Sequence, residues 1–149
     1  MKYLKIFKDS WHELCTMFRN GNFSPNQEQD IICMIYHLCL DKLKYPKLIH
    51  AASTWGFDLI LGSMREERQV KIEKFNHFLL AEFKFILSKG RKNRRLKRAV
   101  KDIEKLSAIG SLKVRRIFAI FDKVNCLERE EIVKLKRIRK NVTVIYGPT

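Results

Sequence analysis

A run of basic residues between positions 89 and 98 is the feature of this sequence with the clearest chemical meaning. The ten residues read KGRKNRRLKR and carry seven positive charges with no acid among them. A polyanion neutralises such a density of charge, and each phosphate contact releases condensed counterions, so binding falls steeply with salt. The run therefore predicts contact with the phosphate backbone of a nucleic acid through Lys89, Arg91, Lys92, Arg94, Arg95, Lys97 and Arg98.

Two further basic clusters follow along the chain. Both are expected on helices that come directly after the first run, so that three cationic segments line one groove. Phosphate contacts of this kind fix the position of a nucleic acid but do not read its sequence, its sugar or its strandedness. The clusters are formed by Lys113, Arg115 and Arg116 and by Lys136, Arg137, Arg139 and Lys140.

The segment 106–117, LSAIGSLKVRRI, suggests how a backbone phosphate is held. Its Ile109, Gly110 and Val114 fall at the offsets at which an apolar residue, a glycine and a small apolar residue form a tight turn between two helices. In this respect the segment resembles the helix-hairpin-helix motif. The resemblance implies a phosphate bound by backbone N–H groups near Gly110, although Ala108 stands where that family usually has glycine. A helix that ends at Gly110 and restarts at Ser111 explains the same residues.

The distribution of charge divides the chain in two. Its 149 residues carry a formal net charge of +15. Residues 1–87 hold 12 Lys and Arg against 10 Asp and Glu, whereas residues 88–149 hold 19 against 6. We therefore expect one domain over 1–149, with a near-neutral hydrophobic helical body (1–87), a basic helical part that contacts nucleic acid (88–140) and a tail (141–149).

The positions of apolar residues predict an all-α fold, a single-domain bundle of about six to seven helices with a short extended C-terminal tail. Apolar residues recur at helical intervals, and Pro, Gly and capping residues fall where helices would end. Ser24, followed by Pro25 and Gln27, predicts one helix start, and the sequence SMRE at 63–66 predicts another. The helices are expected over 3–19, 25–41, 47–61, 63–88, 92–107, 111–124 and 127–140.

Motifs for catalysis and for bound cofactors are few. The sequence holds no Gly-rich phosphate loop, no HExxH and no nucleophile elbow, so we expect a non-catalytic protein without cofactor or metal. Two alternatives stay open. One is a metal-dependent nuclease whose acids meet only in the fold, namely Asp9, Glu13, Glu66, Glu73 and Asp102. The other is a metal site in which two helices contribute His12, Cys15, Cys33 and His37.

The remaining composition bears on location and partners. The four cysteines lie among apolar residues, which favours a reducing compartment, and no apolar run approaches the length of a membrane span. We expect an intracellular protein, cytoplasmic or nuclear, without integral membrane association, that binds RNA or DNA and forms a homo-oligomer if its apolar half is an interface. The main alternative is a protein-interaction module whose basic run is only a nuclear-localisation signal. Binding to acidic lipid is a further alternative.

Overall fold

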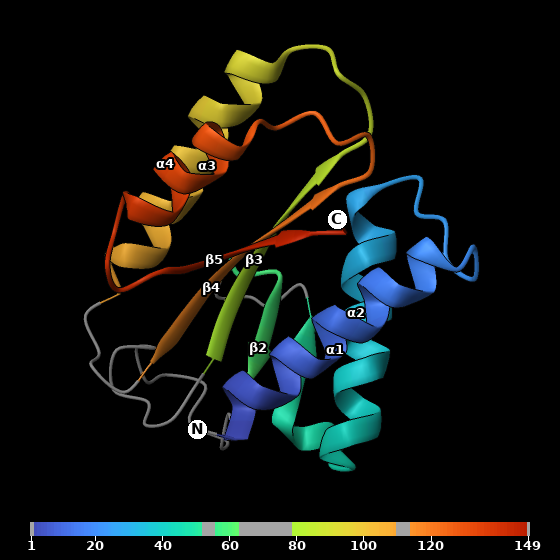
Figure 1. Ribbon diagram of the computed structural model, residues 1–149. Coiled ribbons are helices and arrows are strands. Elements are labelled where there is room, and N and C mark those ends of the chain that lie inside the picture. The colour runs from blue at the N-terminus through green and yellow to red at the C-terminus, as the bar shows by residue number, and fades with distance from the viewer. Residues whose placement is uncertain (1, 52–55, 63–78, 110–113, 149) are drawn as a thin grey trace.

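A mixed β-sheet lies between two pairs of helices in the computed structural model (Figure 1), which describes residues 2–51, 56–62, 79–109 and 114–148. Helices α1 (Lys2–Arg19) and α2 (Glu28–Leu43) cover one face of the sheet. Helices α3 (Lys92–Ser107) and α4 (Arg129–Arg137) cover the other face. The fold is therefore α/β with three layers, and the prediction of an all-α bundle is wrong.

The sheet has five strands in the order β1-β2-β3-β4-β5. The pairs β1–β2 and β2–β3 are antiparallel, whereas β3–β4 and β4–β5 are parallel. Parallel neighbours need a crossover connection, and α3 and α4 supply the two crossovers. The strands are β1 (Ile49–Ala51), which follows a 3₁₀ turn (Pro46–Leu48), β2 (Leu59–Leu61), β3 (Leu79–Ile86), β4 (Arg115–Asp122) and β5 (Thr143–Gly147).

Three predicted helices are wrong, because the structure has strands in the described parts of their ranges. They are the helices over 47–61, 63–88 and 111–124. Strands β1 and β2 lie within the first of them, and strands β3 and β4 occupy the described parts of the other two. Strands β3 and β4 are covered by helices on both faces, so their sequences, LLAEFKFI and RRIFAIFD, are nearly continuous apolar runs. Such runs lack the alternation of a half-exposed strand, and single residues in them also satisfy a helical spacing. Residues 52–55, 63–78 and 110–113 of these predictions lie outside the described residues.

The other four predicted helices are confirmed, three of them with shifted ends. They correspond to α1, α2, α3 and α4. Helix α2 begins at Glu28 rather than at Pro25, because the Asp30 carboxylate accepts hydrogen bonds from the N–H groups of Asn26 (2.8 Å) and Gln27 (3.2 Å). The segment expected as an extended tail is strand β5, which pairs with β4.

Each face of the sheet has its own hydrophobic core. On the α1/α2 side, Phe83 of β3 packs against Phe7, with ring centroids 5.9 Å apart, and Trp11 meets Phe121 of β4 at 6.1 Å. On the α3/α4 side, the buried residues of the sheet pack against α3 and α4. Strands from before and after residue 88 belong to one sheet, and residues 1–87 contribute three of its strands as well as two helices.

Candidate functional site

Strands β2 and β3 stop pairing partway along β3, and this point marks the candidate site. The pairing ends at Leu59 opposite Ala81, while β3 continues to Ile86 alongside β4. Two carboxylates take the place of a neighbouring strand beyond that point. The N–H of Phe83 donates to Asp58 Oδ2 (2.8 Å), and the N–H of Phe85 donates to Glu28 Oε2 (3.1 Å). Acidic side chains thus accept hydrogen bonds from the part of the β3 edge that is not paired with β2.

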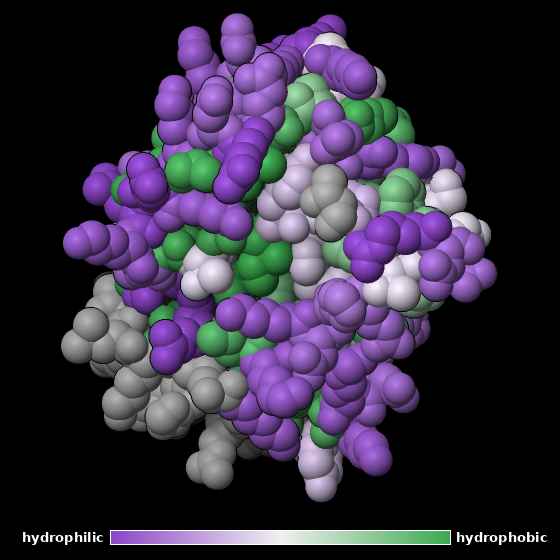
Figure 2. Space-filling model, viewed as in Figure 1, coloured by the Kyte–Doolittle hydropathy of each residue, from purple (hydrophilic) through white to green (hydrophobic). Residues whose placement is uncertain are grey.

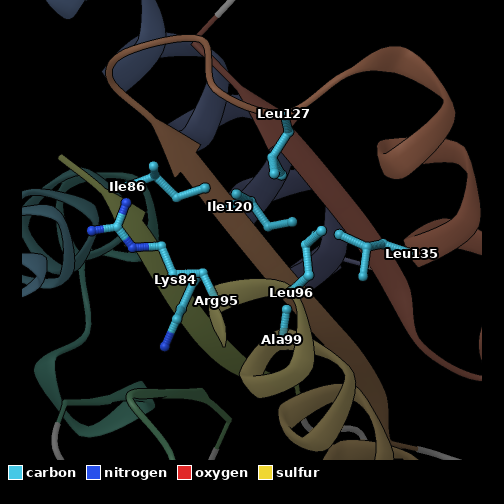
Figure 3. Close-up of a pocket in the computed structure, with 8 residues that line it drawn as sticks. All are labelled: Lys84, Ile86, Arg95, Leu96, Ala99, Ile120, Leu127 and Leu135. Atoms are coloured by element: carbon cyan, nitrogen blue, oxygen red, sulfur yellow. The ribbon is translucent and has the colours of Figure 1, made fainter. Parts of the chain in front are cut away.

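Strand β3 itself carries two charged residues, Glu82 and Lys84, inside its apolar run. Side chains alternate between the faces of a strand, so both project toward α3 and α4 together with Ile86. Lys84 and Ile86 line a small, mostly apolar pocket with Leu96 and Ala99 of α3 (Figure 3). A glutamate and a lysine therefore lie next to each other under a helix, in a layer that is otherwise hydrophobic.

Helix α3 adds an acid and a base to this region. The Lys105 ammonium donates to Glu82 Oε1 (2.6 Å) and to the backbone oxygen of Gly56 (2.6 Å). Asp102, one turn earlier on α3, is close enough to raise the pKa of Glu28 electrostatically. We call the whole group the carboxylate–lysine cluster: Glu28, Asp58, Glu82, Lys84, Asp102 and Lys105.

Burial makes three acids of this cluster, Glu28, Glu82 and Asp102, difficult to ionise. Desolvation, together with the neighbouring Asp58 carboxyl, raises the pKa of Glu82 to about 8, while the Lys105 ammonium acts in the opposite direction. Desolvation also raises the pKa of Glu28 and of Asp102, and the charge of Asp58 adds to both increases. Several carboxyl groups that repel one another in a partly dry environment leave room for a cation to neutralise them.

The exposed cations of α3 lead toward this cluster. Arg94, Lys97, Arg98 and Lys101 are exposed and follow the spacing i, i+3, i+4, i+7, so they share one face of the helix. We call these four residues the α3 stripe. The stripe continues to Lys105 in the last turn, about 16 Å along the helix from Arg94. Figure 2 shows hydrophilic side chains gathered over α3 and α4 at the upper left of the view.

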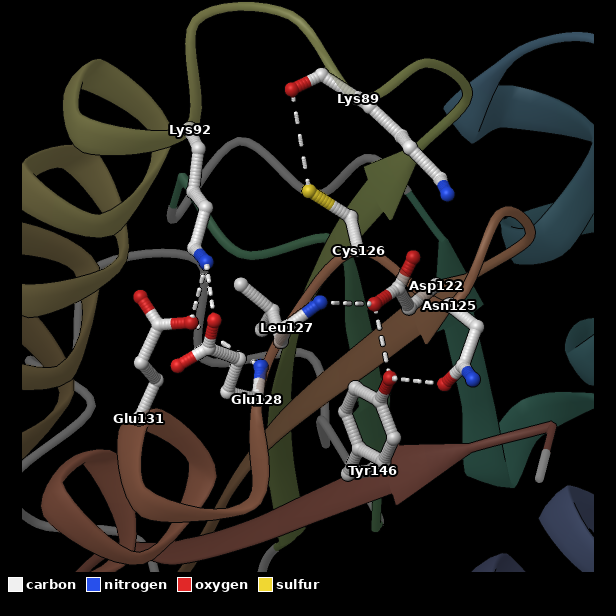
Figure 4. A network of polar contacts seen from close by, with 9 residues as sticks. All are labelled: Lys89, Lys92, Asp122, Asn125, Cys126, Leu127, Glu128, Glu131 and Tyr146. Atoms are coloured by element: carbon white, nitrogen blue, oxygen red, sulfur yellow. Dashed lines mark hydrogen bonds and ion pairs between the residues drawn. The ribbon is translucent and has the colours of Figure 1, made fainter.

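Four of the cations that the sequence assigned to nucleic-acid contact also hold the fold together. Lys92 bridges to Glu131 of α4 at 2.6 Å (Figure 4). Arg139 pairs with Glu104 of α3 at 2.8 Å, and Arg95 donates to the backbone oxygen and the hydroxyl of Ser88. Arg116 is buried and donates to the backbone oxygens of Val114 and Ile109. These four side chains connect α3 to α4 and to neighbouring loops.

The other assigned cations lie at the surface wherever the structure describes them. Besides the α3 stripe, the exposed ones come from the loop before α3, from the start of β4, and from α4 and the turn after it. They are Lys89, Arg91, Arg115, Lys136, Arg137 and Lys140. Gly110 and Lys113 lie outside the described residues, so the turn of the helix-hairpin-helix resemblance is not described. The helix that should follow this turn is strand β4, which removes the two-helix geometry of that motif.

A second polar network closes the end of β4 (Figure 4). The Asp122 carboxylate is 1% exposed, and its Oδ2 accepts from the N–H of Leu127 (2.8 Å) and from the hydroxyl of Tyr146 (2.7 Å). Desolvation and this hydrogen bond raise the pKa of Tyr146. The hydrogen bonds of Asp122 all lie within the protein and connect β5 to the loop before α4. We therefore assign this network a structural role.

The acids proposed from sequence for a nuclease site are dispersed in the fold. Asp9 pairs with Lys5 on α1 at 2.6 Å, and Glu13 pairs with Lys42 at 2.5 Å on the opposite side of the sheet from α3. Asp102 belongs to the cluster, whereas Glu66 and Glu73 lie outside the described residues. Sequence reasoning missed Glu28, Asp58, Glu82, Lys84 and Lys105. The available signal was the pair of charges at 82 and 84, two residues apart within the apolar run of β3.

The helix pairs His12/Cys15 and Cys33/His37 do not assemble in the fold. Cys15 is buried beneath the sheet, where desolvation raises the pKa of its thiol to about 11, and Cys33 is exposed. Within the described ranges, no three His, Cys, Asp or Glu side chains form a group that could hold a metal ion on their own. This also applies to the carboxylate–lysine cluster, where Lys105 is already bound to Glu82.

Comparison with known proteins gives no further information about the site. No protein-family model matches the chain, and neither the curated proteins nor the solved structures give a match. None of the helices in the described parts of the chain has the length and apolar character needed to cross a bilayer.

Proposed function

We propose that this protein binds the phosphate backbone of a nucleic acid along the α3 stripe and hydrolyses a phosphodiester bond at the carboxylate–lysine cluster. The observation that carries the proposal is the position of Glu82 and Lys84 side by side on β3, with Asp58 at the adjacent strand edge. The exposed cations of α3 lead to this point. Binding and chemistry would thus share one helix.

The cluster is difficult to explain as a structural device. Glu82 is 8% exposed, and removing a carboxylate from water costs several kcal/mol before its ion pair restores part of that energy. An apolar residue would serve the packing of β3 against α3 at least as well. Groups of ionisable residues with shifted pKa values are typical of functional sites. This supports a chemical role for the cluster.

The residues suggest a division of labour. Asp58 and Glu82 would hold a divalent cation such as Mg²⁺, which commonly uses only one or two protein carboxylates, with water and substrate phosphate as its other ligands. Such an ion, when bound, polarises the phosphate and activates water. Lys84 supplies a fixed positive charge for the negative charge that develops on the phosphate oxygens. The α3 stripe holds the flanking phosphates and so positions the reacting one.

The sequence-based expectation of a non-catalytic nucleic-acid-binding protein stays a prediction. The carboxylate–lysine cluster favours the nuclease alternative that the sequence had left open, with a different set of acids. Binding without cleavage, or a protein-interaction module with a nuclear-localisation signal, are the outcomes that the test must distinguish. Neither the α3 stripe nor the cluster selects between RNA and DNA.

Cleavage of end-labelled RNA and DNA, single-stranded and duplex, tests the proposal. The purified protein is assayed with Mg²⁺, with Mn²⁺ and with a chelator. We expect metal-dependent cleavage that is lost in Asp58→Asn, Glu82→Gln and Lys84→Met, while Asp41→Asn, on the exposed side of α2, stays active. Binding without cleavage under all metal conditions would leave the non-catalytic function. Absence of binding at low salt would refute both and favour the interaction module.

A further inference from the structure

The ammonium group of Lys105 occupies a place defined by three parts of the fold. It contacts Glu82 Oε1 on β3 and the backbone oxygen of Gly56 before β2, each at 2.6 Å. It also lies 5.0 Å from the ring centroid of Phe57. Two oxygen ligands and an aromatic face surround this cation on several sides.

The two oxygens are of the kind that bind hard metal ions. Carboxylate and backbone carbonyl oxygens are standard ligands of Mg²⁺ and Ca²⁺. Here they converge on an ammonium group that belongs to the protein itself. The position of the Lys105 Nζ is therefore a cation site that the chain fills with its own side chain.

The two side chains of this pair differ in exposure and in conformational freedom. The Glu82 side chain is 10% exposed and fixed in the sheet, whereas the Lys105 side chain is 49% exposed. Lys105 reaches its position from the last turn of α3 on a flexible four-carbon stem. The ammonium can leave toward solvent by rotation of its own side chain, without a change in the packing of α3.

Two cations cannot share this place. Like charges a few ångströms apart repel strongly where water is partly excluded. A divalent ion bound to Glu82 must therefore displace the ammonium, and an ammonium bound to Glu82 must weaken the binding of the ion. The two are competitors for one buried carboxylate.

We propose that Lys105 is a tethered internal cation that fills the metal position of the metal-free protein and must leave Glu82 before a divalent ion binds. This inference rests on the proposed function, because it assumes that Asp58 and Glu82 bind a divalent ion. In the absence of metal, the Lys105 ammonium donates to Glu82 Oε1, whether or not the carboxyl group holds a proton. After displacement its ammonium lies at the end of the α3 stripe, where it is available to a phosphate of the substrate. The protein thereby exchanges one bound cation for another and gains a substrate contact.

Calorimetric titration of the full chain with Mn²⁺, without nucleic acid, measures this competition directly. We compare wild type with Lys105→Met, Lys105→Arg and the control Lys101→Met, which removes an equal charge one turn away on the same helix. Lys105→Met should bind Mn²⁺ about tenfold or more tightly than wild type, because the fraction of protein with a free site rises. Lys105→Arg, which keeps a positive charge, and Lys101→Met should bind about as wild type does.

A second measurement compares the thermal stability of wild type and Lys105→Met, in which Glu82 has lost its hydrogen bond from Lys105. The metal-free Lys105→Met protein should melt at a lower temperature than wild type, and Mn²⁺ should raise its Tm by more than it raises that of wild type. If Lys105→Met does not fold without metal, Lys105→Gln, which removes the charge but keeps a polar end group, takes its place with the same expectation.

The outcomes separate this inference from the proposed function. If wild type binds Mn²⁺ and Asp58→Asn abolishes that binding, but Lys105→Met binds no more tightly than wild type, the competition is refuted and the metal site stands. If folded wild type and folded Lys105→Met both bind no Mn²⁺ at millimolar concentration, the inference is refuted; if wild type also shows no metal-dependent cleavage of nucleic acid, the proposed function is refuted with it. Tighter binding by Lys105→Met that Asp58→Asn removes supports both.

Discussion

Neutralising Arg94, Lys97 and Lys101 should reduce the salt dependence of nucleic-acid binding by an amount that the helix geometry sets. The three side chains are exposed on one face of α3, and Arg94 and Lys101 are seven positions apart, which corresponds to about 10 Å of helix. One strand of a duplex presents a phosphate every 3.4 Å or so along its axis, so the segment faces about three phosphates. Each contact contributes a slope of about −0.9 in log K against log salt.

The triple Gln variant should therefore have a slope less steep by about 2–3 than that of wild type. Between 50 and 200 mM salt, this difference changes the ratio of the two affinities by about 40-fold. Fluorescence anisotropy with a labelled duplex, in the presence of a chelator that prevents cleavage, measures both slopes. Arg98 is left unchanged, because its charge also acts on Asp102 of the cluster.

A matched variant separates the position of the charges from their number. Lys2, Lys8 and Lys44 are exposed on α1 and at the end of α2 and can be changed to Gln with the same loss of net charge. We expect this triple to keep the slope of wild type. Equal slopes for the two triples would refute the assignment of the binding surface to α3, and a wild type without measurable binding would refute nucleic-acid contact altogether.

Three other predictions concern stability. Gly147→Ala should lower the free energy of unfolding by about 1–3 kcal/mol in a urea titration, because a Cβ there would lie 2.7 Å from Cys15 Sγ; unchanged stability would show that β5 can move away from α1. In metal-free buffer, wild type should lose stability as the pH rises from about 5 to 8, because folded Glu82, with its pKa near 8, binds a proton that the unfolded chain has released. Thermal melts of Glu82→Gln should show a weaker dependence on pH than those of wild type, because only the raised pKa values of Glu28 and Asp102 remain. A parallel pH profile in both proteins would contradict the burial argument for Glu82. Asp122→Ala should cost about 2–4 kcal/mol, since it leaves the buried N–H of Leu127 without its acceptor and leaves the Tyr146 hydroxyl only the longer contact with Asn125 Oδ1 (3.4 Å), against about 1 kcal/mol for Tyr146→Phe; equal losses would show that the N–H of Leu127 finds another acceptor.

Local signals were sufficient for the helices that carry a clear amphipathic stripe. Helix α3 runs over the predicted residues 92–107, because its charged face and its apolar face are sharply separated in sequence. Helix α1 is similar. The shift at the start of α2 came from Asp30, which captures two backbone N–H groups ahead of the helix and so ends the preceding loop at Gln27.

The central strands were misread because their environment is not local. The run LLAEFKFI is covered on both faces, by α1 and α2 on one side of the sheet and by α3 on the other, and all its residues except Glu82 and Lys84 are apolar. A strand that is buried on both faces does not alternate between apolar and polar residues. A few apolar residues at helical spacing are then enough to suggest a helix. The richness of β3 and β4 in Phe and Ile was the available evidence for strands.

The sequence by itself determined the charge, the cationic face of α3 and the positions of four helices, because each depends on residues a few positions apart. Only the tertiary structure decided that Asp58, Glu82 and Lys105 meet, since their contacts join residues 23 or more positions apart through the pairing of β2 with β3 and the crossover of α3. Strand pairing and helix docking are stabilised by burial of apolar surface that is distant along the chain. The chemistry of the site is for that reason a property of the fold, whereas the cations that lead to it are a property of the sequence.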